Sequence, residues 1–276
     1  QQIHMAEAVE AAIQNEQHAI IEAGTGTGKT YAYLVPALLS GKKVLISTGT
    51  KTLQDQLYHR DIPQLLQVLR KQLDDVPELA LLKGRSNYLC LYRAELAEQD
   101  PQLKRYQRQD LNKITRWQYS TVSGDKAELS TVPEDASIWH KVTSTAENCL
   151  GSECPKHDEC YVMQARRKAQ QADLVVVNHH LLMADIRLRE EAFAELLPDY
   201  GVLILDEAHQ LPAIASQFLG YSLTSRQLQL LVGDTQTAWA ESAKDSPELP
   251  DLLNILDAAV VHLELQLGEP RQRSWE

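Results

Sequence analysis

Two short motifs, far apart in the sequence, contain residue types that handle phosphate and metal. Residues 23–30 read AGTGTGKT, a glycine-rich run that ends in a lysine and a threonine. Small residues let backbone N–H groups converge on phosphate oxygens, the lysine reaches the terminal phosphates, and the threonine hydroxyl binds Mg²⁺. A glycine-rich turn with a chance lysine is the alternative, and it is disfavoured because an apolar run precedes the motif and a helical pattern follows it. The predicted nucleotide ligands are Gly24, Thr25, Gly26, Thr27, Gly28, Lys29 and Thr30.

The second motif, VLILDEAH at residues 202–209, places acids at the end of an apolar strand. A carboxylate there, in the same parallel sheet as a phosphate loop, is placed to hold the nucleotide's Mg²⁺. We assign that role, shared with Thr30, to Asp206, and we assign Glu207 as the base that activates the attacking water. The alternative is that the two acids only begin a helix, where its dipole favours them. The loop at residues 23–30 favours the catalytic interpretation, with Lys29, Asp206 and Glu207 as catalytic residues.

The four cysteines form a third constellation, with the spacing C-x58-C-x4-C-x5-C. Four cysteines are too few for a disulfide scaffold in a chain of this length, and three of them fall within a dozen residues. Four thiolates suit a [4Fe–4S] cluster or tetrahedral zinc, and the spacing favours iron–sulfur because structural zinc sites usually show two close pairs. The candidate ligands are Cys90, Cys149, Cys154 and Cys160.

Strands alternating with helices must position these motifs. Short apolar runs predict strands at 18–22, 43–47, 79–82, 174–177 and 202–205, and helices are expected at 31–40, from 52, at 227–240 and at 249–266. Continuously apolar strands separated by helices are typical of a parallel sheet covered on both faces. The fold class is therefore α/β, with a doubly wound parallel sheet around a phosphate loop.

The region between the third and fourth predicted strands breaks this rhythm. It lacks apolar periodicity and an obvious core, and it contains all the cysteines, so a metal would supply folding free energy. Between Lys83 and Lys126 nine basic residues face five acids, which predicts a local binding channel for nucleic acid beside the cluster. We expect a first sheet segment at 1–84, an insertion at 85–171, a second sheet segment at 172–212 and a helical segment at 213–276.

Composition sets the broad class. The chain has 276 residues, a formal net charge of −11 and 24% charged residues, values ordinary for a globular protein. No apolar run is long enough to span a bilayer, and the acidic balance argues against a protein that coats nucleic acid through its overall field. The sequence shows no signal peptide, and both ends look like cuts in a longer sequence. Clustered thiols then favour a reducing cytoplasm.

Together these motifs resemble the iron–sulfur branch of helicase superfamily 2, the DinG/XPD-like DNA helicases. The DEAH box and the phosphate loop carry the resemblance, and further matches are QIHM at 2–5, STGTKTLQDQL at 47–57, KGRSNYLC at 83–90 and DLVVVNHHLL at 173–182. The resemblance covers nearly the whole chain. It implies a RecA-like motor domain with an inserted [4Fe–4S] domain between its segments and the start of a helical, Arch-like insertion at residues 213–276.

The resemblance also assigns roles to single residues. It places Gln2 at the adenine, His209 in the coupling of nucleotide state to the motor, and Thr48 and Thr50 on single-stranded DNA. Arg85, just before the first cysteine, is a further candidate DNA contact. For the two threonines and the arginine, a capping or solvated role is the alternative.

The function that the resemblance implies is an ATP-dependent bacterial DNA helicase that moves 5′ to 3′, uses ATP, Mg²⁺ and the cluster, and acts in DNA repair or at replication forks. The implied partners are single-stranded and forked DNA, a second RecA-like domain and repair or replication proteins. No such second domain follows in this chain, so we expect weak activity from it alone. Two alternatives remain: a metal-stabilised module that binds single-stranded DNA without separating strands, and a phosphate-loop ATPase that does not act on nucleic acid.

Overall fold

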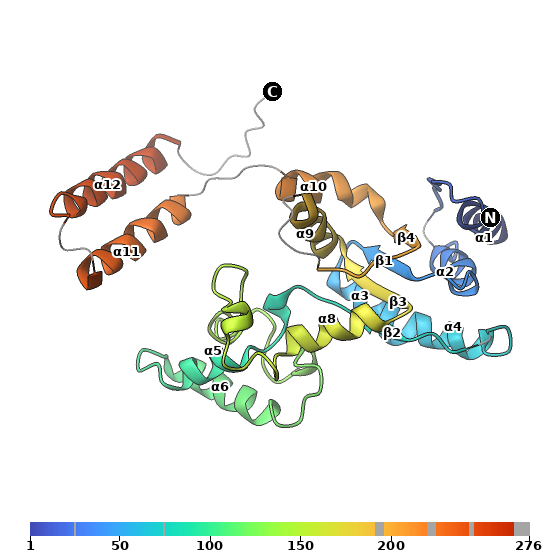
Figure 1. Cartoon of the computed structure of the whole chain (residues 1–276), viewed down its shortest axis with the longest axis horizontal. Helices are drawn as coiled ribbons and strands as arrows, with labels where there is room; N and C mark the ends of the chain where they lie inside the picture. The colour runs from blue at the N-terminus through green and yellow to red at the C-terminus, as the bar shows by residue number, and fades with distance from the viewer. Residues whose placement is uncertain (25, 74, 191–195, 220–224, 243–245, 268–276) are drawn as a thin grey trace. The chain divides into compact units, whose positions relative to one another are not determined.

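The computed structural model describes the chain apart from residues 25, 74, 191–195, 220–224, 243–245 and 268–276. The chain divides into two compact units, residues 1–219 and 220–276. The first contains the sheet and the cysteine-bearing insertion, and the second contains two helices (Figure 1). No helix among the described residues is long and apolar enough to cross a membrane.

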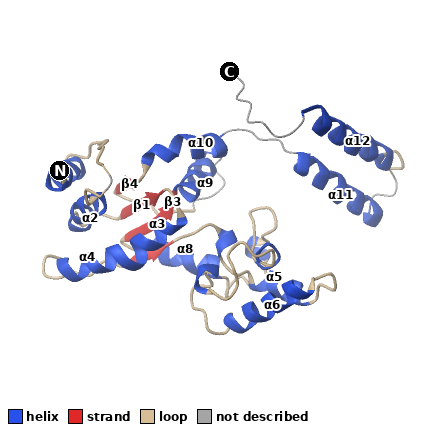
Figure 2. Ribbon diagram, turned by 180° about the vertical axis from the view of Figure 1, so that it is seen from behind, coloured by secondary structure: helices blue, strands red, loops and turns tan. Residues whose placement is uncertain are grey.

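A four-stranded parallel sheet lies at the centre of the first unit. Its strands, in the spatial order β2-β3-β1-β4, are the red elements in Figure 2. Their bounds are β1 Val44–Thr48, β2 Leu79–Leu81, β3 Leu174–Asn178 and β4 Val202–Leu205. The predicted parallel α/β sheet is confirmed, and each of these strands lies within one residue of its predicted place.

Helices cover both faces of the sheet because its strands are apolar on both faces. Val44, Ile46 and Val176 point into one core, against the helices α1, α2 and α4. Leu45 and Val175 point into the opposite core, against α8, α9 and α10. The bounds of these helices are α1 Gln2–Gln14, α2 Lys29–Leu39, α4 Ile62–Leu69, α8 Tyr161–Gln171, α9 His179–Glu190 and α10 Leu211–Leu219. The doubly wound architecture follows from this alternation.

The predicted first strand does not form. Residues 18–22 have no strand structure, and Ile20 is 103% exposed. A run of five residues becomes a strand only where a neighbouring strand supplies its hydrogen bonds, and among the described residues β4 pairs only with β1. Leu203 and Leu205 on β4 are 38% and 39% exposed and belong to neither core, where the sequence predicted a buried strand.

Between β1 and β2 the chain forms one nearly continuous helical segment. Helix α3 spans Lys51–Gln56, a π-helical turn follows at Leu57–Asp61, and α4 completes the segment. Thr50 caps α3, since its hydroxyl accepts a hydrogen bond from the Leu53 amide at 3.2 Å. Within α3, the amide of Gln54 is fully buried and donates to the carbonyls of Leu82 and Val176, so this helix is fastened to the ends of β2 and β3.

The insertion between β2 and β3 has an apolar core of its own, which corrects the prediction of a region without one. Tyr88, Leu89, Ile114, Trp139 and Tyr161 belong to this core. Its residues come from short helices and turns, so they show no single period in the sequence. The helices and 3-10 turns are α5 Leu91–Glu98, α6 Arg105–Trp117, α7 Trp139–Val142, Arg85–Asn87, Lys126–Glu128 and Gly151–Glu153.

The second unit contains helices α11 Ser225–Ser242 and α12 Leu249–Leu267, which pack against each other. Val232 on α11 and Leu253 and Val260 on α12 are buried. These two helices confirm the helical pattern expected at 227–240 and 249–266. A last 3-10 turn, Ala208–Gln210, lies in the first unit and leads into α10.

Candidate nucleotide and cluster sites

The phosphate loop ends where helix α2 begins, at Lys29. Gly28 caps the helix in the left-handed conformation, with φ of 78°, which a residue with a side chain adopts only under strain. The side-chain amide of Gln2 lies against Gly28. It donates to the Gly28 carbonyl at 3.2 Å and occupies the space that a Cβ at residue 28 would need. The loop and the N-terminal Gln2 therefore lie side by side. Thr25, a further predicted ligand, lies outside the described residues.

The two motifs meet at the carboxyl ends of the parallel strands. Lys29 Nζ lies 3.5 Å from Glu207 Oε1, although 178 residues separate them, and each side chain is 29% exposed. Glu207 itself has a left-handed backbone, with φ of 55°. For a residue other than glycine this conformation costs about 1–3 kcal/mol and persists only where the surroundings hold it.

Asp206 lies deeper in the same site. Its backbone amide donates to the carbonyl of Ser47 at 2.8 Å, and its Oδ2 accepts a hydrogen bond from the hydroxyl of Thr48 at 3.4 Å. Burial, followed by the charge of Glu207, raises the pKa of Asp206 above its usual range. A bound divalent cation would favour the ionised form, so this environment suits a metal ligand.

Tyr33 is a site residue that the sequence interpretation missed. It lies on the turn of α2 that follows Thr30, and its hydroxyl is buried without a well-formed hydrogen bond among the described residues. Burial and the nearby charge of Asp206 raise its pKa. A buried hydroxyl beside Thr30 and Asp206 fits a site completed by Mg²⁺ and its water molecules. The signal in the sequence is its spacing of three from Thr30 on one helix face.

His209 is largely exposed, and its Nδ1 lies 3.4 Å from Glu207 Oε2. His179, the first residue of α9, is fully buried, and its Nδ1 lies 2.7 Å from the hydroxyl oxygen of Ser47 on β1. Burial is the main reason that the pKa of His179 is lowered. Together these histidines flank Asp206 and Glu207, one from solvent and one from the core.

The three candidate DNA contacts lie in different environments. Thr48 is fully buried and its hydroxyl donates to Asp206, so it does not lie on an open surface. Thr50 is exposed at the start of α3. Arg85 is half-buried at the start of its 3-10 turn, near Arg166, whose pKa is lowered by burial and then by the charge of Arg85.

The four cysteines are free thiols. Cys90 precedes α5, Cys160 precedes α8, and Cys149 is exposed. Burial is the main reason that the pKa of Cys90 is raised, and the other three thiols add to this effect. The donors fit a [4Fe–4S] cluster in number and chemistry. Among the described residues, however, no three His, Cys, Asp or Glu side chains converge closely enough to hold a metal.

The fold and the two motifs define a class: a phosphate-loop α/β domain with a DEAH box at the carboxyl ends of its strands. Residues 3–74 match the DEAD/DEAH box helicase family. Residues 58–228 match the DEAD_2 family, so the chain belongs to DEAD_2 and to the DinG/XPD-like helicases within it.

The relatives place it further, as a YoaA-like member. It is 50% identical over 275 residues to the "ATP-dependent DNA helicase YoaA" of Escherichia coli, covering 99% of this chain and 42% of that protein. The Haemophilus influenzae YoaA is 49% identical, covering 97% and 41%. The "ATP-dependent helicase DinG" of Mycobacterium tuberculosis is 39% identical over 82% of this chain and 36% of that protein. The chain thus spans about two fifths of the length of its YoaA relatives.

Proposed function

We propose that this chain is the first motor domain of an ATP-dependent DNA helicase that moves 5′ to 3′ on single-stranded DNA. The observation that carries the proposal is the meeting of Lys29 with Glu207 across the sheet, beside Asp206. The relatives named as helicases support the nucleic-acid part. We further propose that the full-length protein acts in DNA repair or replication-fork processing. It would do so in a bacterial cytoplasm, together with repair or replication proteins.

Each residue has a defined part in the proposed reaction. Gln2, beside Gly28, reads the adenine, and the loop amides together with Lys29 hold the phosphates. Thr30 and Asp206 hold Mg²⁺, which when bound neutralises charge that develops on the phosphates. Glu207 accepts a proton from the attacking water. His209, at the exposed rim, is placed to sense the nucleotide.

The second RecA-like domain would supply the arginine that stabilises the transition state. We therefore expect this chain alone to bind nucleotide and DNA weakly, to hydrolyse ATP poorly and to leave duplex DNA intact. The proposed division is a motor domain from 1–84 and 172–212, a cluster insertion at 85–171, and an Arch-like segment at 213–276.

A fluorescent ATP analogue tests the nucleotide site. The chain should bind it with Mg²⁺, and Lys29→Ala should weaken binding by at least about tenfold because a phosphate contact is lost. Equal binding by the parent and Lys29→Ala would overturn the assignment of the loop. DNA-stimulated ATPase activity of the full-length protein separates a helicase motor from a phosphate-loop ATPase with another target, since only the former responds to single-stranded DNA.

Cys90, Cys149, Cys154 and Cys160 would hold the [4Fe–4S] cluster. Visible absorption with iron and zinc analysis, on protein prepared anaerobically, distinguishes iron–sulfur from zinc. Cys149→Ser should abolish iron content and, in the full-length protein, DNA unwinding, while nucleotide binding at the loop persists. Iron-replete, fully active Cys149→Ser protein would contradict the proposed ligand set.

A further inference from the structure

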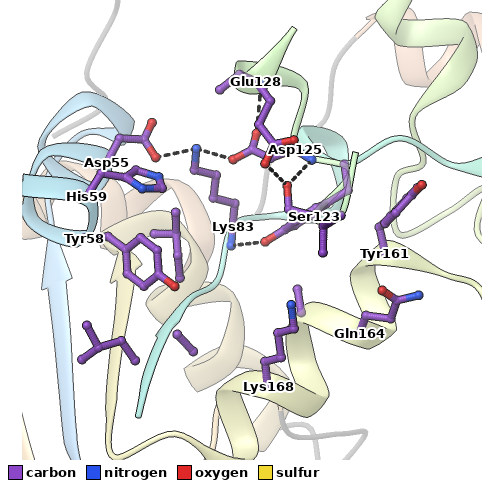
Figure 3. Close-up of a pocket in the computed structure, with 17 residues that line it drawn as sticks. Asp55, Tyr58, His59, Lys83, Ser123, Asp125, Glu128, Tyr161, Gln164 and Lys168 are labelled. Atoms are coloured by element: carbon purple, nitrogen blue, oxygen red, sulfur yellow. Dashed lines mark hydrogen bonds and ion pairs between the residues drawn. The ribbon is translucent and has the colours of Figure 1, made fainter. Parts of the chain in front are cut away.

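A buried lysine joins the insertion to the motor domain. The Lys83 side chain is only 2% exposed, and its Nζ lies 2.6 Å from Asp55 on α3 and 2.6 Å from Asp125 in the insertion. Figure 3 shows this ionic triad, with Asp55 approaching from one side and Asp125 from the other. Lysine is almost never buried without a partner, and here two carboxylates stabilise its charged form.

Local hydrogen bonds anchor Lys83 and Asp125. The backbone amide of Lys83 donates to the hydroxyl of Tyr88 at 3.0 Å, and Tyr88 forms an antiparallel bridge with Asp125. The other carboxylate oxygen of Asp125 accepts from the amide of Ala127 at 3.1 Å. Burial alone would lower the pKa of Lys83, but its hydrogen bonds with Asp125 and Asp55 raise it.

The triad lies on the wall of a cavity of about 440 Å³ between the two parts. Tyr58 and Leu81 line the cavity from the motor domain, and Val122, Tyr161 and Gln164 line it from the insertion. The insertion packs around a core of its own, and Ala165 on α8 packs against both this core and a core of the motor domain. The ionic triad therefore adds a second attachment, between the insertion and α3, to the apolar contact that α8 makes with the sheet.

The two carboxylates belong to segments that carry proposed DNA contacts. Asp55 lies on α3, which Thr50 caps, and Asp125 lies in the positive stretch from Lys83 to Lys126 that predicts a nucleic-acid channel. Fixing Asp55 and Asp125 to one ammonium group sets the distance between these segments. We infer that Lys83 is a positioning residue that holds the insertion against α3, so that both segments meet one stretch of single-stranded DNA; the DNA part of this inference rests on the proposed function.

Asp125→Asn is the sharpest test. It keeps the oxygen that accepts from Ala127, leaves Lys83 in a neutral pair with Asp55, and removes only the ionic link to the insertion. The matched control is Asp100→Asn, which removes the partner of Lys141 in an exposed ion pair of 3.1 Å and likewise keeps an oxygen for a backbone amide. Lys83→Arg, which retains the charge, serves as the conservative variant.

Amide hydrogen exchange provides the first measurement. Asp125→Asn should speed exchange in residues 84–90 and 123–129 by about tenfold, with strands β1 and β3 unchanged, because the link opens locally. Asp100→Asn should match the parent. Equal exchange in Asp125→Asn and the parent overturns the inference, whether or not the chain binds DNA.

Binding of a fluorescent oligothymidylate provides the second measurement. Asp125→Asn should weaken binding by about fivefold without changing its salt dependence, since no phosphate-contacting cation is lost. Lys83→Arg should remain within about twofold of the parent, because the charge is preserved and the adjacent cavity of about 440 Å³ leaves room for the larger side chain. Parent-like affinity in Asp125→Asn contradicts the positioning role. A parent chain that binds no DNA instead contradicts the proposed function, and hydrogen exchange then decides the inference.

Discussion

At the phosphate loop and at the ionic triad of Lys83, Asp55 and Asp125, a lysine lies against acidic side chains. The two lysines differ in exposure and in the number of their partners. We call the boundary between insertion and motor domain at this triad the seam. Lys29 is partly exposed and lies 3.5 Å from one carboxylate, whereas Lys83 is buried and lies 2.6 Å from each of two. A loose, hydrated pair can exchange its partner for a ligand. A buried triad cannot, because separating its charges in a medium of low dielectric constant is costly. We therefore propose that similar residue types serve ligand binding at Lys29 and attachment of the insertion at Lys83.

The largest expected effect comes from removing the buried charge. Lys83→Met leaves two carboxylates unpaired at the seam and should lower the free energy of unfolding by about 3–5 kcal/mol. Adding Asp55→Asn and Asp125→Asn should restore most of that loss, since a neutral seam needs no counter-charge. Urea unfolding followed by circular dichroism measures both. If Lys83→Met is as stable as the parent, the buried triad does not contribute to stability, and the proposed difference between Lys29 and Lys83 is wrong.

At the phosphate loop, removing the acidic partner of Lys29 should change nucleotide affinity rather than the free energy of unfolding. Glu207→Gln frees Lys29 from its ion pair, so the Mg²⁺-dependent affinity for an ATP analogue should rise about threefold, or ~0.6 kcal/mol. The unfolding free energy should change by less than about 1 kcal/mol, as for other partly exposed pairs. Fluorescence titration checks the affinity, with Glu22→Gln as an exposed control. Weaker binding by Glu207→Gln would show that the pair does not compete with nucleotide.

Tyr33 offers a finer comparison, because its buried hydroxyl has no well-formed protein partner. Tyr33→Phe should leave stability unchanged or raise it by up to about 1 kcal/mol. It should also weaken Mg²⁺-dependent nucleotide binding about threefold if the hydroxyl orders water around the metal. Binding measured with and without Mg²⁺ separates a metal effect from a packing effect. An equal loss in both conditions would place the hydroxyl outside the metal site.

The smallest effect concerns His179. Burial lowers its pKa below the ordinary value of 6.5, so the unfolded chain binds the proton more tightly. Its contribution to stability is therefore complete above pH 6.5 and is lost as the pH falls through the folded pKa. His179→Gln should flatten the fall in unfolding free energy below pH 6.5 by up to about 1 kcal/mol. Urea titrations at several pH values test this, and an unchanged slope would assign the acid sensitivity elsewhere.

The sequence predicted the phosphate loop, the DEAH box and the parallel strands because each is a local pattern with a fixed order. The seam was missed for the opposite reason. Lys83 was counted as one of nine cations in a positive stretch, but in the structure it is buried and neutralised by acids from two distant segments. Likewise, the sequence does not show where β1 ends. Because the strand ends at Thr48, that residue is buried, whereas Thr50 lies beyond the strand and is exposed. The core of the insertion was invisible because Leu89, Ile114 and Trp139 follow no common period.

The place of the insertion in the sheet also affects how the chain must fold. The amide of Glu78 donates to Asp173 at 2.8 Å, joining residues 95 positions apart where β2 and β3 begin to pair. Closing a flexible loop of that length costs about 4 kcal/mol of chain entropy. An insertion that condenses around Tyr88, Ile114 and Tyr161 brings its two ends together first and shortens the effective loop. We therefore expect the rate of sheet formation to depend on a segment that contributes no strand to it.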